Sequence, residues 1–108
     1  MVRDIVATDS QIAFLFKTFA AQQSAEQVAM LMDDLCTIRE INEMATRLAV
    51  AQMLAEGASY LQVSEETGSS ATTIARVSKC LNHGSGGYRS VFGLTKNSSQ
   101  QPEGSWTN

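Results

Sequence analysis

A glycine at position 68 divides the stretch LQVSEETGSSATTIARVSKCL into two short amphipathic segments, and this feature constrains the fold most. Before it lies Val63. After it come Ile74, Val77 and Leu81, whose spacings of three and four place them on one helix face. Gly68 can adopt the positive φ that a sharp turn between two helices requires. The stretch therefore predicts two short helices joined by a tight turn.

The other face of the second predicted helix is polar. Two serines, good N-caps, precede it, and short hydroxyls are followed by cations along it. Such a helix can enter a DNA major groove with its first turns near base edges and its cations near phosphates. A plain helical hairpin with a solvated polar face has the same pattern, so this segment alone leaves both interpretations open. The residues concerned are Ser69, Ser70, Thr72, Thr73, Arg76 and Lys79.

Charge is distributed unevenly along a chain whose net charge is −3. Ten of the eleven acidic residues lie within positions 4–66, whereas positions 67–102 hold no acid and four cations. Charges act over about 8–10 Å in salt, so the local sign matters more for phosphate binding than the total. This distribution favours a DNA binder of modest affinity that needs a specific site and two copies of its recognition helix.

Capping signals predict two helices near the N-terminus. The first covers residues 9–21, with Asp9 or Ser10 as its N-cap. Ser24 opens the second, and Gln27 follows at the spacing of a capping box.

A longer helix is expected in the middle of the chain. Thr37 and Glu40 have capping-box spacing, and the helix should run to Glu56, just before a glycine. Its apolar residues form more than one stripe, which predicts a central helix buried on several sides. Ser59 and Gln62 provide a further capping box for the first helix of the glycine-hinged pair.

These elements predict an all-α protein with a single helical domain of about six helices. The domain should cover residues 1–95, with the helix-turn-helix at about 59–82 and a flexible C-terminal tail at 96–108. That tail contains Trp106 and has too little apolar surface to order itself. One short helix before the tail should cover the core with Tyr88, Val91, Phe92 and Leu94.

The N-terminal half carries a surplus of apolar residues for so small a domain. Part of it is expected to face a second copy, giving a homodimer that presents two recognition helices. A monomer that buries the whole set internally is the alternative. The set comprises Phe14, Leu15, Phe16, Phe19, Val28, Met30, Leu31, Met32 and Leu35.

Several classes of protein are excluded. The sequence has no apolar run long enough for a transmembrane span and no signal-peptide layout, so a cytoplasmic location is expected. Cys36 and Cys80 lie far apart, with His83 as the one histidine, which favours buried reduced thiols over a metal site.

No catalytic motif is present, so the protein is not expected to be an enzyme. The remaining rival to a DNA binder is a helical protein-interaction module that has lost DNA binding. The acidic N-terminal half is compatible with that alternative.

The segments DDLCTIREINEMATRLAVAQMLAEG and SYLQVSEETGSSATTIARVSKCLNHG together resemble the Trp repressor family, most closely its YerC/YecD group. The resemblance covers about half the chain and rests on an ordered set of motifs. These are the T-x-x-E opening, the Thr46–Arg47 pair, the E-T-G hinge and the A-T-T-I-x-R helix start. It implies an intertwined, all-helical homodimer that binds double-stranded operator DNA as a transcriptional regulator, most simply a repressor.

By this resemblance, the base-contacting turn falls on Ala71, Thr72 and Thr73. Alanine and threonine methyl groups can contact thymine methyls, and the hydroxyls can bond base edges. Gln62 lies in the region where the Trp repressor has a DNA-contacting arginine, so a different operator sequence is expected.

The resemblance also implies a candidate effector pocket. Arg47 and Arg76 match the arginines that sandwich the indole of tryptophan, and Thr37 matches a residue that helps hold its carboxylate. Val77 replaces a glycine that leaves room for the indole, and Cys80 replaces a serine that bonds the ligand's amino group. An extra branched side chain in a close-packed slot costs about 1–3 kcal/mol. Binding of tryptophan or another small carboxylate is therefore not expected, and no cofactor or metal is predicted.

Three of these residues have simpler roles available. Thr37 fits an N-cap, Arg47 can pair with Glu43 one turn earlier, and Arg76 can contact a phosphate.

Overall fold

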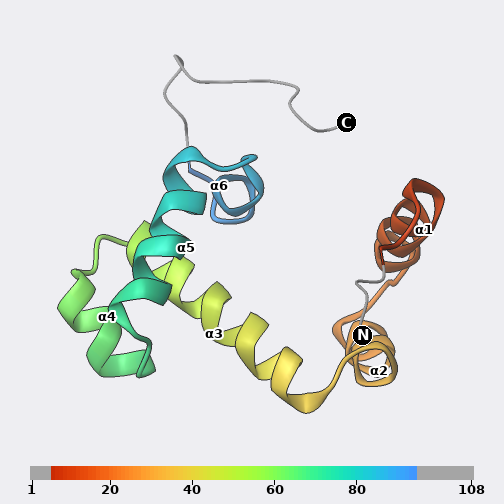
Figure 1. Cartoon of the computed structure of the whole chain (residues 1–108), viewed down its shortest axis with the longest axis horizontal. Coiled ribbons are helices and arrows are strands. Elements are labelled where there is room, and N and C mark those ends of the chain that lie inside the picture. Colours follow the sequence, from red (N-terminus) through yellow and green to blue (C-terminus); the bar gives the residue numbers. More distant parts are fainter. Residues whose placement is uncertain (1–5, 95–108) are drawn as a thin grey trace. The chain divides into compact units, whose positions relative to one another are not determined.

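The computed structural model describes residues 6–94, and Figure 1 labels its helices in their order along the chain. Over that range the chain forms six α-helices and no strand, which confirms the all-α prediction. None of the helices in this part of the chain is long and apolar enough to cross a membrane. The helices are α1 (Asp9–Ala20), α2 (Ala25–Leu35), α3 (Ile38–Ala55), α4 (Tyr60–Thr67), α5 (Ala71–His83) and α6 (Gly87–Val91).

The chain divides into two compact units, residues 1–41 and 42–108. Helices α1 and α2 belong to the N-terminal unit, whereas α4, α5 and α6 belong to the C-terminal unit. Helix α3 begins in the first unit, and most of its length lies in the second. The tail at 96–108 expected from the sequence lies outside the described residues.

Side-chain caps define where the N-terminal helices begin. Thr8, and not Asp9 or Ser10, is the N-cap of α1, because Thr8 is extended and forms a reciprocal capping box with Gln11. Ser24 caps α2 as predicted, by accepting from the backbone N–H of Gln27 at 3.0 Å.

The predicted capping box of α2 is only half formed. The Gln27 side chain accepts from the backbone N–H of Gln23 at 2.7 Å instead of returning to Ser24. The capping box of α3 is complete: Thr37 Oγ1 accepts from Glu40 N at 3.1 Å, and Glu40 Oε1 accepts from Thr37 N at 2.8 Å.

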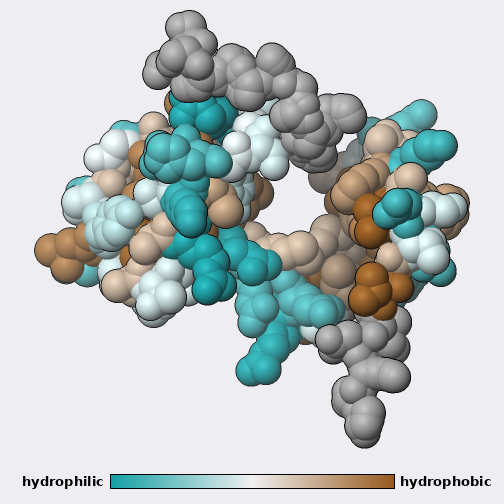
Figure 2. Space-filling model, turned by 45° about the horizontal axis from the view of Figure 1, so that its top comes forward, coloured by the Kyte–Doolittle hydropathy of each residue, from teal (hydrophilic) through white to brown (hydrophobic). Residues whose placement is uncertain are grey.

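The N-terminal unit has helices without a core. Neither α1 nor α2 contains a buried residue. Phe14 is 71% exposed, Met30 is 64% exposed and Ile38, at the start of α3, is 73% exposed. Apolar side chains accordingly appear at the surface of these helices in Figure 2. This unit therefore lacks the packing that stabilises most helices in proteins, and helices of this length are only marginally stable in water without it.

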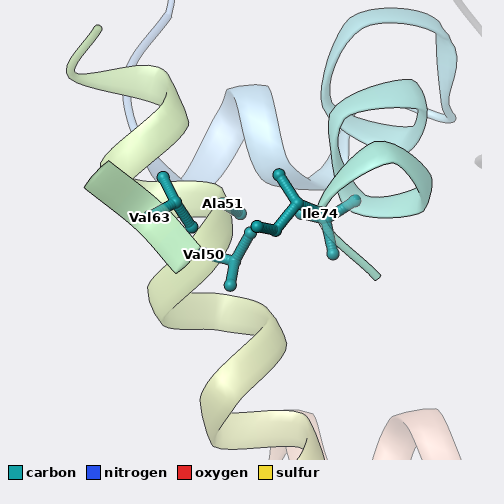
Figure 3. Packing of buried hydrophobic residues seen from close by; sticks show 5 residues of the cluster. Val50, Ala51, Val63 and Ile74 are labelled. Carbon is teal, nitrogen blue, oxygen red and sulfur yellow. The ribbon is translucent and has the colours of Figure 1, made fainter. Parts of the chain in front are cut away.

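The C-terminal unit has a small dry core. Val50 and Ala51 from α3, Val63 from α4, and Ile74 and Val77 from α5 are all at most 2% exposed. Figure 3 shows the α3, α4 and α5 side chains meeting in one cluster. Helix α5 contacts both α4 and α6, so it is held on two sides.

The short helix α6 covers this core as predicted. Tyr88 and Phe92 pack against the core, and their rings stack with centroids 6.4 Å apart. Val91, which was expected to join them, is 68% exposed on the outer side of the helix.

Two further predictions about burial were wrong. Helix α3 has only Val50 and Ala51 buried, and Leu48 is 48% exposed, because the core that α3 shares with α4 and α5 buries only those two of its residues. The two thiols are free but not buried: Cys36 is half-buried and Cys80 is exposed, since Cys80 lies on α5 outside the buried stripe.

Candidate nucleic-acid interface

The turn between α4 and α5 has the geometry of a helix-turn-helix. Ser59 and Gln62 form the predicted capping box at the start of α4. Helix α4 ends at Gly68, whose φ of 74° is left-handed and whose backbone N–H donates to the carbonyl oxygen of Ser64 at 2.9 Å. Glycine is the residue that adopts this conformation without strain. The predicted hinge at Gly68 is thus confirmed.

The apolar stripe of α5 anchors this helix in the core. Ile74, Val77 and Leu81 are 1%, 2% and 5% exposed. Ser70 caps the helix, accepting from the backbone N–H of Thr73 at 3.1 Å. Since one face is fixed in the core, the opposite face of α5 is directed outward.

That outward face presents Thr72, Arg76 and Lys79, all exposed. Within residues 6–94, the side chains of Arg76 and Lys79 form no ion pair or hydrogen bond. No acidic residue lies on α5 to neutralise them. Both cations can therefore reach an external anion without first breaking an internal contact.

The hydroxyl groups around the turn bond one another. Thr67 Oγ1 donates to the carbonyl oxygen of Val63 at 2.7 Å and lies 2.9 Å from Ser69 Oγ. The backbone N–H of Ser69 also reaches Thr67 Oγ1, at 3.2 Å. Ser70 Oγ donates to Thr73 Oγ1 at 3.2 Å. These bonds form two separate groups, one joining Thr67 to Ser69 at the end of α4 and one joining Ser70 to Thr73 at the start of α5.

Thr67 is a residue whose role the sequence interpretation missed. The signal was present, because a threonine in the last turn of a helix commonly bonds the carbonyl four residues earlier. Its neighbours Ser69 and Ser70 had been considered only as caps and DNA contacts.

Gln62 has a divided role. Its side-chain oxygen accepts from the backbone N–H of Ser59 at 2.9 Å, which fixes the start of α4. Gln62 is exposed, and the NH₂ group of its side-chain amide can still donate a hydrogen bond.

The residues of the candidate effector pocket have different environments. Thr37 caps α3 in the N-terminal unit, as its simpler role predicted. Arg47 is exposed on α3, and within the described residues its side chain forms no ion pair with Glu43 or any other acid. Val77 belongs to the apolar core, whereas Cys80 is exposed one turn beyond Arg76 on α5. Val77 therefore occupies core space instead of lining an open site.

No group of three or more metal-ligating side chains lies close together in residues 6–94.

Comparison with known proteins agrees with this geometry. The family model for the Trp repressor protein matches residues 10–96. The protein YerC of Bacillus subtilis (strain 168), itself uncharacterized, is 43% identical over 82 residues, which is 76% of this chain and 79% of that protein.

Two solved structures share the fold. The crystal structure of a TrpR-like protein from Eubacterium eligens has a TM-score of 0.75 and 35% identity, covering 82% of this chain and 94% of that one. A structure from Staphylococcus aureus has a TM-score of 0.73 and 30% identity, with 83% and 93% covered. The family model spans the complete helix-turn-helix together with α2, α3, α6 and all of α1 after Asp9. The chain belongs to the Trp repressor family.

Proposed function

We propose that this protein is a sequence-specific DNA-binding transcriptional regulator that acts as a repressor by occluding a promoter. Membership of the Trp repressor family supports a DNA-binding regulator and gives no support to an enzyme. The observation that carries the proposal is the outward face of α5, where Arg76 and Lys79 lie exposed and unpaired within the described residues. This function belongs to the cytoplasm, the location expected from the sequence.

In the proposed complex, α5 enters the major groove with its first turn toward the bases. Ala71, Thr72 and Thr73 lie in that turn, whereas Arg76 and Lys79 lie one and two turns further along, where phosphates flank the groove. Ser69 and Ser70 precede the helix, and the amide of Gln62 can reach the DNA backbone from α4. These assignments follow from position on the fold and the chemistry of the side chains.

We also propose that the active form is an intertwined homodimer. Large apolar side chains are exposed on α1, α2 and the start of α3, and neither α1 nor α2 contains a buried residue. Exposed apolar surface of this kind marks an interface. In the dimer, residues 1–95 would form one helical dimerisation and DNA-binding domain in each protomer. Two copies of α5 could then contact half-sites about 34 Å apart.

The salt dependence of DNA binding tests the role of the α5 cations. Each phosphate contact contributes about −0.9 to the slope of log K against log salt, so Lys79→Ala should make the slope of a dimer shallower by about 2. Lys79→Ala should also weaken binding to all sequences alike. Lys17→Ala is the matched control, because Lys17 is an exposed cation on α1 and should leave the slope unchanged.

Equal slopes for the wild type and both variants would contradict the assignment. If no DNA of any sequence bound at low salt, a helical protein-interaction module that has lost DNA binding would replace the proposed function.

A further inference from the structure

The hydroxyl side chains at the turn and the start of α5 differ in how they are used. Five hydroxyl residues lie between positions 67 and 73. Thr67, Ser69, Ser70 and Thr73 all take part in the side-chain hydrogen bonds of the turn. Within residues 6–94, the Thr72 side chain takes part in none, and Thr72 is exposed.

Thr73 is held in place by its neighbours. Its backbone N–H donates to Ser70 Oγ at 3.1 Å, and its Oγ1 accepts from the same oxygen at 3.2 Å. Thr73 is also half-buried. Because Thr73 bonds Ser70, the N-cap of α5, a change at Thr73 should alter how the helix begins. Thr73 therefore helps to position α5.

Thr72 has the opposite properties. Its hydroxyl can donate or accept, so it can bond an acceptor or a donor on a base edge, and its methyl group can pack against the methyl of a thymine. It also lies beside Ala71, which adds a second small apolar surface at the helix start. No internal hydrogen bond has to be broken before Thr72 contacts DNA.

We propose that Thr72 determines the base preference at one base pair of each half-site, whereas Thr73 together with Ser70 positions the helix. This inference rests on the proposed function, since it divides roles within the same DNA-contacting turn. The Thr72 hydroxyl, which has no hydrogen bond within the described residues, contacts the base. The Thr73 hydroxyl, which bonds Ser70, does not.

Isosteric variants separate the two roles. Valine keeps the shape of threonine and removes the hydroxyl, so Thr72→Val and Thr73→Val form a matched pair on adjacent residues. Each protein is measured for relative affinity against a set of operator duplexes in which every base pair of a half-site is changed in turn. Thermal unfolding of each protein by circular dichroism is measured in parallel.

For Thr72→Val, discrimination should fall about 3- to 10-fold at one base pair of the half-site, as expected for the loss of one or two hydrogen bonds. Its melting temperature should equal that of the wild type, because within the described residues the Thr72 side chain has no hydrogen bond to lose. For Thr73→Val, affinity for all duplexes and the melting temperature should fall together while the pattern of base preference is retained. Thr73→Ser, which restores the hydroxyl, should recover both.

Three results would overturn the inference. A changed base preference in Thr73→Val with an unchanged pattern in Thr72→Val would reverse the roles. An unchanged pattern in both variants would exclude hydroxyl recognition by either residue. A wild-type protein that bound all duplexes equally, or bound none, would remove the proposed function itself and this inference with it.

Discussion

The two units of this chain form their helices by the same local means but differ in what packs against them. Helices α1 and α2 have side-chain caps and no buried residue, whereas α3, α4 and α5 meet in a core of residues at most 2% exposed. Caps fix where a helix begins, and burial fixes where it lies. The difference indicates that the C-terminal unit carries its own tertiary structure, and in the homodimer that we propose the N-terminal unit packs against a second copy.

The largest expected effect is on the core of the C-terminal unit. Ile74→Ala removes a side chain that is 1% exposed, so the free energy of unfolding should fall by about 2–5 kcal/mol. Urea denaturation at a fixed protein concentration measures this change. Leu61→Ala is the control, because Leu61 is 68% exposed on α4 and should change stability by less than about 0.5 kcal/mol. Similar losses in both variants would contradict the core described here.

The next effect concerns the uncovered N-terminal unit. Phe14→Lys places a charge where a phenylalanine is 71% exposed in the single chain, and should raise the dimer dissociation constant by about tenfold or more. Sedimentation equilibrium over a range of concentrations gives this constant. Leu61→Lys makes the same kind of change in the C-terminal unit and should leave the constant unaltered. A wild-type protein that stays monomeric at every concentration would exclude the homodimer.

The smallest effect separates backbone conformation from packing. Gly68→Ala should lower the free energy of unfolding by about 1–2 kcal/mol, because Gly68 has a left-handed backbone conformation. Steric overlap does not contribute, since a Cβ at Gly68 meets no atom within 4 Å. Gly87 also has open space around it but no positive φ, so Gly87→Ala in α6 should leave stability equal or slightly higher. Thermal unfolding of the two variants gives the comparison. Equal destabilisation would mean that the hinge conformation is not the cause.

Much of the fold could be predicted from local patterns. A capping box involves residues three apart, so Thr37 with Glu40 and Ser59 with Gln62 were evident from spacing. The stripe that anchors α5 was evident from its periodicity. Such features depend on neighbouring residues, and a sequence shows its neighbours directly.

The remaining features depend on contacts that spacing does not reveal. The exposure of α3 depends on whether other helices cover it, and its apolar residues were consistent with either outcome. The N-cap of α1 is a different case, because Gln11 follows Thr8 at capping-box spacing and this local signal was overlooked in favour of Asp9 and Ser10. In the candidate interface, the sequence showed five hydroxyl residues but not which of them bond one another.

The central claim is that the outward face of α5 binds specific DNA as part of a homodimer. The most direct test is selection of fragments from sheared genomic DNA by the purified full-length protein, with and without added tryptophan. We predict enrichment of a pseudo-palindromic site whose half-sites lie about one helical turn apart, recovered equally in both conditions because Val77 belongs to the core. Enrichment only with tryptophan would refute this view of Val77. The absence of any enriched fragment at low salt would contradict the DNA-binding account.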